Sequence, residues 1–374
     1  MLSAALTSFA IGSTVAHLVT TGLVLRRLRQ SPGPQPDHLP FITLLRPVCG
    51  LDPFDAETLA SSFTQDYPAF EVVFCVAQRD DPVVALVERL IAQHPGVSAR
   101  LLTGNSAITG NPKLNNLHKG WIGSTADWIA MADSNLLLPP DYLRTLAGSW
   151  RMDSGMISAP PIGIRPDGFA AALECAFLNG NQARLQLAAD SLGMGFAQGK
   201  TLFWRRDLLD RAGGLAALGH DLAEDAAATK LMRRLGWNVT LTPHPFPQPI
   251  GRRSLRAVWD RQMRWSRVRR DGFPVLFLAE VLNTPVLPAL AIGWGMGPWA
   301  AAVLLLTLYA AETILLCRSG WPHAWRDLLA MPLRDLLILP LWLGTFAARG
   351  FEWRGTTMTP PENEDRVDPI LLPE

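Results

Sequence analysis

Three aspartates stand at points of the chain where a carboxylate could do chemistry. Asp81 follows the apolar run FEVVFCVA, Asp133 follows IAMA, and Asp225 stands beside Glu224 near the start of a predicted helix. Polar side chains just beyond the strands of an open α/β sheet line the crevice in which ligands bind. Asp133 is therefore a candidate ligand for a metal ion. Asp225 is a candidate general base, because a neighbouring acid raises the pKa of a carboxyl group.

Each aspartate also has a purely structural explanation. Asp81 precedes Pro82, and proline favours the first position of a helix, so Asp81 taken alone is better explained as a helix cap. Asp133 could simply end its strand in a turn. Asp225 could be a favourable negative charge near a helix N-terminus. The residue types alone leave these alternatives open.

A second group of candidates lies in an arginine-rich segment. Residues 252–270, RRSLRAVWDRQMRWSRVRR, contain eight arginines and an apolar spacing that predicts an amphipathic helix along a membrane surface. Arg261 and Arg264 are one turn apart, and Trp265 is next to them. Guanidinium groups can bind a diphosphate bidentately, and an indole can pack on a sugar. Binding of anionic lipid headgroups is the alternative explanation.

These residues need a scaffold, and residues 41–250 alternate short β-like runs with helical patterns. This alternation predicts an α/β fold with a mostly parallel sheet covered by helices. The predicted strands are 41–47, 70–77, 98–103, 127–133, 155–160, 200–204 and 237–242, and the predicted helices are 55–65, 82–94, 112–121, 140–152, 168–187 and 221–235.

Residues 1–25 carry no formal charge and are followed by three arginines within residues 26–29. About 20 apolar residues suffice for a helix to span a bilayer, which favours an uncleaved anchor over 1–29. A cleaved signal peptide is the alternative, but it requires positive charge before a shorter apolar run. By the positive-inside rule the arginines place the following residues in the cytosol. The proline-rich residues 30–40 are predicted to be a linker.

A second apolar zone covers residues 273–348. The 31 residues 281–311 lack formal charge and are interrupted by GWGMGP, which predicts two helices with a tight turn. A third candidate, 328–348, carries Arg334 and Asp335 near its start, and only 336–348 is uninterrupted. Thirteen residues are short for a span and favour an interfacial or re-entrant helix. Residues 349–374 are predicted to form a cytosolic, partly disordered tail.

The overall composition narrows the function classes. With 34 Lys+Arg against 33 Asp+Glu the net charge is +1, which argues against a nucleic-acid partner. Only 18% of residues are charged, fewer than the roughly 25% of soluble domains, so part of the surface need not face water. The four cysteines are scattered singly, which indicates neither a disulfide framework nor a structural zinc site.

Eight ordered motifs make residues 40–270 similar to the membrane-bound ceramide glucosyltransferase family: LLRPVCGLDP, QDYPAFEVVFCV, RDDP, GNPKLNNLHKG, ADSN, AGGL, LAEDAAATK and RQMRW. The resemblance implies a nucleotide-sugar domain of GT-A type over 41–250, an interfacial helix over 251–272 and membrane helices over 273–348. It assigns Asp81, Asp133 and Asp225 to the three aspartates of the family. Lys113 matches a family lysine that either neutralises phosphate or caps its helix.

The same resemblance implies that Arg261, Arg264 and Trp265 form the family's (Q/R)-x-x-R-W signature. Many GT-A enzymes have D-x-D at the strand end, whereas here Asp133 is followed by Ser-Asn, as in the truncated D-S-x of this family. Hopanoid sugar transferases usually keep the second aspartate and have D-D-Y in place of A-E-D. The resemblance implies Mg²⁺ or Mn²⁺ at Asp133, where one carboxylate stands in place of the usual two.

The implied reaction is an inverting transfer of a hexose, glucose first, from a UDP-sugar to the primary hydroxyl of a membrane lipid, ceramide first. Asp225 would be the base, the signature arginines would stabilise the leaving UDP, and Asp81 would contact the uridine end. Diacylglycerol or a hopanoid as acceptor, with UDP-galactose or UDP-N-acetylglucosamine, is the alternative. A processive polysaccharide synthase and an inactive nucleotide-sugar sensor are more distant ones. Thirty arginines against four lysines indicate a GC-rich bacterial genome, and so an inner-membrane protein with its catalytic domain in the cytoplasm.

Overall fold

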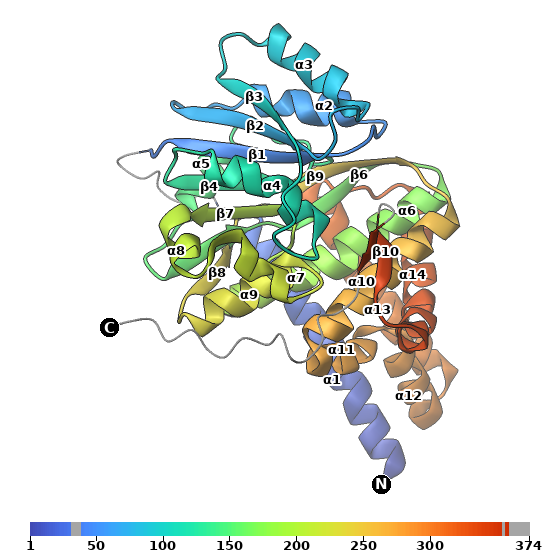
Figure 1. The fold of residues 1–374 in the computed structure, drawn as a ribbon. Helices are drawn as coiled ribbons and strands as arrows, with labels where there is room; N and C mark the ends of the chain where they lie inside the picture. Colours follow the sequence, from blue (N-terminus) through green and yellow to red (C-terminus); the bar gives the residue numbers. More distant parts are fainter. Residues whose placement is uncertain (31–38, 354–355, 359–374) are drawn as a thin grey trace. The chain divides into compact units, whose positions relative to one another are not determined.

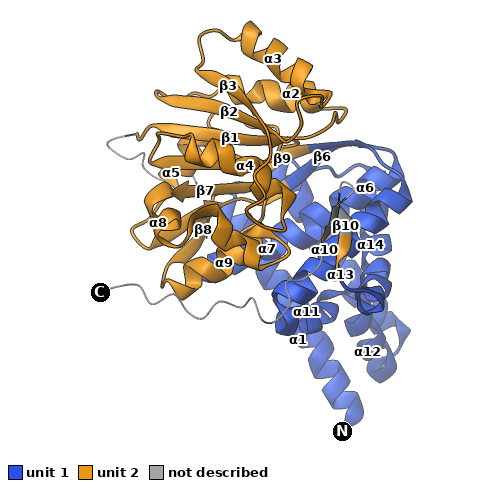
Figure 2. Ribbon diagram, viewed as in Figure 1, with its two compact units in different colours: residues 1–30, 162–193, 249–349 blue, residues 31–161, 194–248, 350–374 orange. Residues whose placement is uncertain are grey.

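The computed structural model describes residues 1–30, 39–353 and 356–358, and the chain divides into two compact units (Figure 2). The sheet unit comprises residues 31–161, 194–248 and 350–374. The helical unit comprises residues 1–30, 162–193 and 249–349. Each unit is built from segments that are far apart in the sequence.

The sheet unit is organised around a seven-stranded sheet of order β3-β2-β1-β4-β7-β5-β8 (Figure 1). Its described strands are β1 (Ile42–Val48), β2 (Phe70–Val76), β3 (Ala99–Thr103), β4 (Trp128–Ala132), β5 (Ser154–Ser158), β7 (Thr201–Arg205) and β8 (Asn238–Leu241). Strands β1 to β4 are parallel, and β7 runs antiparallel to both β4 and β5. The carboxyl ends of β1, β2 and β4 therefore share an edge with the beginning of β7.

Helices cover both faces of this sheet because successive strand residues point to opposite sides. In β1, Leu44 belongs to a core with the helices of one face, whereas Leu45 belongs to the core of the other face. The first face carries α2 (Asp55–Ala60), the 3₁₀ turn Ser61–Phe63, α3 (Val83–Gln93) and α5 (Tyr142–Gly148). The second carries α4 (Pro112–Ile122), α8 (Arg206–Arg211), the 3₁₀ segment Gly214–His220 and α9 (Glu224–Arg234).

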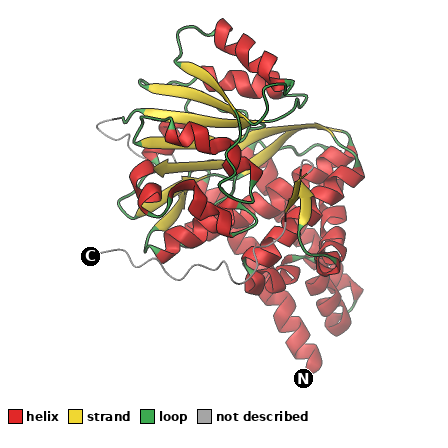
Figure 3. Cartoon of the chain, in the orientation of Figure 1, coloured by secondary structure: helices red, strands yellow, loops and turns green. Residues whose placement is uncertain are grey.

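The helical unit consists mostly of helices (Figure 3). Its helices are α1 (Leu2–Arg27), α6 (Phe169–Cys175), α7 (Arg184–Ser191), α10 (Leu255–Gly272), α11 (Pro274–Glu280), α12 (Val286–Met296), α13 (Pro298–Ser319) and α14 (Trp325–Gly344), with short 3₁₀ turns at Val281–Asn283 and Thr345–Ala347. Strands β6 (Pro161–Asp167) and β9 (Phe246–Arg252) pair as a separate two-stranded sheet.

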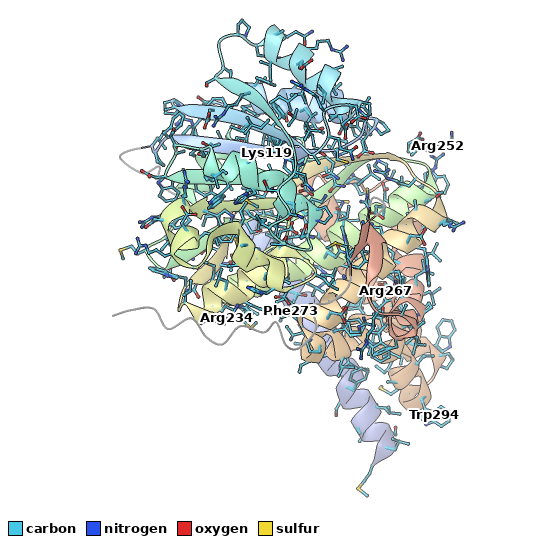
Figure 4. The ribbon with its side chains drawn as sticks, viewed as in Figure 1. Lys119, Arg234, Arg252, Arg267, Phe273 and Trp294 are labelled. Atoms are coloured by element: carbon cyan, nitrogen blue, oxygen red, sulfur yellow. The ribbon has the colours of Figure 1, made fainter. Side chains whose placement is uncertain are left out.

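Three described helices are long and apolar enough to cross a membrane: Leu2–Arg27, Pro298–Ser319 and Trp325–Ala347. A fourth crossing is possible by length and composition if Pro274–Asn283 and Val286–Met296, bent by 51°, count as one span. Large apolar side chains are exposed on these helices, among them Val19, Val303 and Trp294, whose side chain is labelled in Figure 4. A contiguous apolar exterior of this kind is typical of a surface that meets lipid.

The helix predicted over 168–187 is continuous but belongs to the helical unit, so the predicted domain 41–250 is not one compact unit. Residues Ala176–Ala183 between α6 and α7 are π-helical. Ala172, Leu173 and Phe177 pack with Val258 of α10 and Ala330 of α14. The helical pattern was correctly interpreted, but the apolar face it predicts covers other helices and not the sheet.

All seven predicted strands are present in the main sheet, each within two residues of its predicted ends. Strands β6 and β9, whose four prolines obscure a strand pattern, and the short helix α8 were not predicted. The third apolar candidate was predicted to be short, yet α14 is one helix of 20 residues. Its inner charges Arg334 and Asp335 pair with each other. The prediction had treated them as two separate charges that interrupt the apolar run.

The chain's last described residues form a hairpin of β10 (Phe351–Trp353) and β11 (Thr356–Met358). This hairpin lies at the beginning of the segment predicted as a tail, 349–374. Most of the predicted linker 30–40 and the remainder of the tail lie outside the described residues.

Candidate functional site

Asp133 and Lys200 meet at the carboxyl edge of the sheet because β4 and β7 run antiparallel. Ala132 of β4 is the register partner of Thr201 of β7. One residue beyond this pair, the Asp133 N–H donates to the Lys200 carbonyl oxygen at 3.1 Å. The fold thus brings together two side chains that are 67 positions apart in the sequence.

The Asp133 carboxylate lies between two ammonium groups. Lys113 Nζ is 2.7 Å from Oδ1, and Lys200 Nζ is 2.8 Å from Oδ2. Burial alone would raise the pKa of this carboxyl group, but the charges of Lys113 and Lys200 outweigh burial and hold its pKa well below the usual range. Asp133 is therefore ionised throughout the physiological pH range.

Lys113 connects Asp133 to the acidic start of α9. It lies at the N-terminus of α4, where the Asn111 side chain caps the helix by accepting from the Lys113 N–H at 2.9 Å. Its ammonium group donates to Glu224 Oε1 and to the Gly199 carbonyl oxygen, each at 2.6 Å. Burial lowers the pKa of Lys113, but the two carboxylates outweigh this effect and raise it above the ordinary value. Lys113 is thus a buried ionic link, and the cap of α4 is Asn111.

Asp225 is held at the first turn of α9 by two backbone donors. Its Oδ2 accepts from Gly199 N and its Oδ1 from Ala226 N, both at 2.8 Å. Burial and, second, the charge of Glu224 raise the pKa of Asp225 to about 6. A carboxylate with a pKa near 6 is a better proton acceptor at neutral pH than an ordinary aspartate, because the base strength grows with the pKa. The assignment of Asp225 as a base remains a prediction.

Gly199 joins the two halves of this cluster, and a larger residue there would displace the Glu224 side chain. Its N–H binds Asp225 and its carbonyl binds Lys113, while a Cβ atom would lie 2.6 Å from Glu224 Oε1. We expect Gly199→Ala to lower the catalytic turnover rate at least tenfold, because the displaced Glu224 would pull Lys113 from Asp133. Turnover and the thermal midpoint of the purified variant check this. Gly213→Ala, in an open turn of the same unit with φ near 99°, is the matched alanine control and should cost stability but not turnover.

Arg46 binds the backbone of the turn after β4. It is fully buried in β1, and its Nη2 donates to the carbonyl oxygens of Ser134 at 3.1 Å and Leu136 at 3.2 Å. A third acceptor is the carbonyl oxygen of Thr58 at 3.0 Å. This guanidinium group fixes the backbone that carries the Asp133 and Asn135 side chains.

Asp81 lies in the loop after β2, where its carboxylate accepts hydrogen bonds from two nearby backbone N–H groups. Its Oδ1 accepts from Val83 N at 2.9 Å, at the start of α3, and both carboxylate oxygens lie within 3.0 Å of Gly50 N. The carboxylate thus binds the first N–H of α3, but the N-cap of that helix is Pro82 and not Asp81, one residue later than the sequence predicts. Contact of Asp81 with a uridine remains a prediction.

The signature residues Arg261, Arg264 and Trp265 belong to α10 in the helical unit. Arg261 Nη1 pairs with the buried carboxylate of Glu174 at 2.8 Å, and its guanidinium lies 5.8 Å from the centre of the Trp265 ring. Trp265 packs against a small cluster that includes Cys175 and Ile250. These contacts give Arg261 and Trp265 a role in packing. Their convergence with Arg264 on a diphosphate stays a prediction.

Two oxygen atoms converge on one point at the turn after β4. Lys200 Nζ donates to Asp133 Oδ2 at 2.8 Å and to Asn135 Oδ1 at 3.0 Å, so both oxygens face the same cation. A carboxylate, an amide carbonyl and phosphate oxygens are a donor set that suits Mg²⁺ or Mn²⁺. Within the described ranges, no group of three or more His, Cys, Asp or Glu side chains could hold a metal ion. Asp133 and Asn135 supply only two oxygens, and the Lys200 ammonium takes the point on which they converge, so a metal ion there would need further ligands from a bound phosphate.

Lys200, Asn135 and Gly199 were not among the site residues predicted from the sequence. A signal for Lys200 exists: the chain has only four lysines, and two of them bind Asp133. Of the other two, Lys119, labelled in Figure 4, binds the Gly104 carbonyl oxygen, and Lys230 pairs with Asp221. In a chain that otherwise uses arginine, a lysine indicates a place that requires a compact charge.

A surface cavity of about 840 Å³ lies elsewhere in the sheet unit. It is lined by Trp128, Trp150 and Arg205, among others. Trp128 begins β4, whereas Asp133 follows its end. The cavity is therefore at the opposite end of the strand from the candidate residues, and we assign it no part in the site.

This sheet, with its acidic edge after β4, is of the GT-A type found in transferases that use nucleotide sugars. The solved mannosyltransferase PcManGT from Pyrobaculum calidifontis, in complex with GDP-Man and Mn²⁺, matches it with a TM-score of 0.54 and 20% identity, over 88% of this chain and 99% of that one. Residues 4–364 match the model of Glycosyl transferase family 21, and the chain belongs to that family.

Curated relatives carry the same family resemblance. The chain is 28% identical to "Ceramide glucosyltransferase 1" of Caenorhabditis elegans, over 75% of this chain and 61% of that protein. It is also 28% identical to "Ceramide glucosyltransferase" of Komagataella phaffii, over 74% of this chain and 65% of that protein. The chain thus spans less than two thirds of the length of these relatives.

Proposed function

We propose that the chain is an inverting glycosyltransferase that moves a hexose, glucose first, from a UDP-sugar to the primary hydroxyl of a membrane lipid, ceramide first. The observation that carries the proposal is the position of Asp225, a carboxyl group with a pKa raised to about 6 that accepts from the Gly199 N–H, while the Gly199 carbonyl oxygen binds Lys113, the ion-pair partner of Asp133. Family membership and the two relatives support the sugar and the acceptor.

The chemistry requires a base and a stabilised leaving group. As the lipid oxygen attacks the anomeric carbon, its proton passes to a carboxylate oxygen of Asp225. The new carbon–oxygen bond forms while the bond from the anomeric carbon to the diphosphate breaks, and UDP leaves with the electron pair. Asp133 and Asn135 would hold the cation that neutralises the leaving diphosphate. Arg261 and Arg264 are proposed to stabilise the same charge.

The site is proposed to work at a membrane. Ceramide and diacylglycerol are retained in the bilayer by about 0.8 kcal/mol for every buried methylene, so the protein must reach the headgroup at the interface. The three helices long enough to span support a membrane location. We place the sheet unit on the cytoplasmic side of a bacterial inner membrane, because the positive charges after α1 favour that side.

The test uses the purified full chain in detergent. Radiolabelled UDP-glucose, UDP-galactose and UDP-N-acetylglucosamine are each incubated with ceramide, diacylglycerol or a hopanoid, and lipid-linked label is separated from free sugar. We expect glucose on ceramide, with β configuration by proton NMR. Label on another lipid would contradict ceramide as the acceptor, and an α-linked product would contradict an inverting mechanism. A soluble labelled polymer would favour a polysaccharide synthase.

A further inference from the structure

The turn after β4 carries its own cation. Asp133 Oδ2 and Asn135 Oδ1 both accept from the Lys200 ammonium, and Lys113 occupies the second carboxylate oxygen of Asp133. The side chains of Lys113 and Lys200 are only 10% and 15% exposed. Neither ion pair is therefore a solvated surface contact.

The two lysines differ in what they neutralise. Lys113 lies between Asp133 and Glu224 and also binds the Gly199 carbonyl oxygen, so its charge is shared between the carboxylate that follows β4 and a carboxylate of α9. Lys200 lies at the last position before β7, on the edge where the parallel strands end. A ligand that binds beyond this edge meets the Lys200 side of Asp133.

The amide of Asn135 makes this arrangement possible. A second carboxylate at position 135 would give two negative charges around one point, which a divalent ion balances better than an ammonium group. With one carboxylate and one neutral amide, the single charge of a lysine balances Asp133. An ammonium is also compact, unlike the planar guanidinium group of arginine, and donates in three directions.

We propose that Lys200 is the built-in cation of the donor site, which takes the place of a divalent metal ion opposite the diphosphate of a nucleotide sugar. The inference rests on the proposed function, since it concerns the donor of that reaction. Asp133 and Asn135 hold the ammonium group by two of its donors and aim it at the bound phosphate oxygens. Lys200 thereby joins Asp225 as a residue that touches the reactants.

The test measures UDP binding by isothermal titration calorimetry on the full chain in detergent, with EDTA or with Mn²⁺. We expect the wild-type chain to bind UDP equally in both buffers. Lys200→Met should bind about 10- to 100-fold more weakly in EDTA, since a charge-assisted hydrogen bond is lost. Mn²⁺ should restore most of its affinity, because the emptied oxygens of Asp133 and Asn135 then accept the ion.

Lys230→Met is the matched control, because Lys230 also pairs with an aspartate in the sheet unit, Asp221, but away from Asp133. It should bind UDP like the wild type in both buffers. Thermal midpoints of both variants verify that they are folded.

Three results would overturn the proposal. Wild-type binding that requires Mn²⁺ would show that a metal, and not Lys200, supplies the charge. Unchanged binding of folded Lys200→Met in EDTA would remove Lys200 from the donor site, and weak binding that Mn²⁺ does not restore would reduce it to a structural role. If the wild-type chain binds UDP in neither buffer, the proposed donor itself is wrong, which separates that failure from the other three.

Discussion

Asp225→Asn is expected to lower the turnover of the lipid-linked product by about 100- to 10,000-fold, the range that a positioned general base contributes. Asparagine keeps the size of the side chain and can still accept one of the two backbone hydrogen bonds, from Gly199 or Ala226. It cannot take a proton from the lipid hydroxyl. The measurement is the initial rate with UDP-glucose and ceramide, together with UDP affinity, which should change by less than about tenfold.

Asp221→Asn provides the control for this substitution. This substitution also replaces a carboxylate by an amide, four residues earlier in the chain. The partner of Asp221 is Lys230, which is not part of the cluster around Lys113. Turnover of Asp221→Asn should stay within about twofold of the wild type. A comparable rate for Asp225→Asn and Asp221→Asn would remove Asp225 from the mechanism.

The pH dependence of turnover tests the same assignment. The base is active when deprotonated, and its pKa is about 6, so kcat/KM should rise tenfold per pH unit below pH 6 and level off above it. Glu224 raises that pKa by its charge, so Glu224→Gln should move the rising limb to lower pH. A limb that stays in place in Glu224→Gln would indicate that another group titrates.

The strands of the sheet unit were predictable because their apolar runs are bounded by turn residues, and the strand 200–204 was among them. Its direction was not. A run such as TLFW has the same appearance whether it runs parallel or antiparallel to its neighbour, since direction depends on how the chain returns to the sheet. The antiparallel direction of β7 brings Lys200 to Asp133. This is why the predicted site contained Asp133, Lys113 and Asp225 but not Lys200.

Local signals could identify single roles but not partners. Pro82 correctly indicated that a helix starts next to Asp81, whose carboxylate accepts from the Val83 N–H, although the N-cap is Pro82 itself. Neighbouring Glu224 correctly indicated a perturbed Asp225. The partner of Arg261, Glu174, is 87 positions away and had no local signal. A sequence spacing can show that Arg261 and Arg264 share a face, yet it cannot show what that face contacts.

In the helical unit, too, the role of a charged residue depends on its partners and not on its type alone. Arg334 of α14 donates from Nε to Asp335 Oδ1 at 2.9 Å and from Nη2 to Glu312 Oε2 of α13 at 3.0 Å. The three side chains are at most 3% exposed. Gly180 leaves the space for this group, since a Cβ there would lie 1.8 Å from Glu312 Oε1. Isolated charges would be costly at this depth, whereas one cation between two carboxylates offsets most of the cost.

Arg334→Met is therefore expected to destabilise the helical unit by about 3–5 kcal/mol, the usual result of leaving a buried charge without its partner. The check is the unfolding midpoint of the purified chain in detergent, by intrinsic tryptophan fluorescence against denaturant. Arg326→Met, on the same helix but exposed, should change the stability by less than about 1 kcal/mol.

A triple variant distinguishes lost charge balance from lost packing. Arg334→Met combined with Glu312→Gln and Asp335→Asn removes all three charges while it keeps the side-chain volumes. If the penalty is electrostatic, this variant should regain most of the lost stability, because neutral amides are less costly to bury than unpaired carboxylates. If it is as unstable as Arg334→Met alone, the arginine acts through its hydrogen bonds, including the 3.2 Å contact with the Ala176 carbonyl oxygen at the start of the π-helical segment. In that case the hydrogen bond from Arg334 to the segment Ala176–Ala183 stabilises the position of α14, and the charges of Glu312 and Asp335 contribute little.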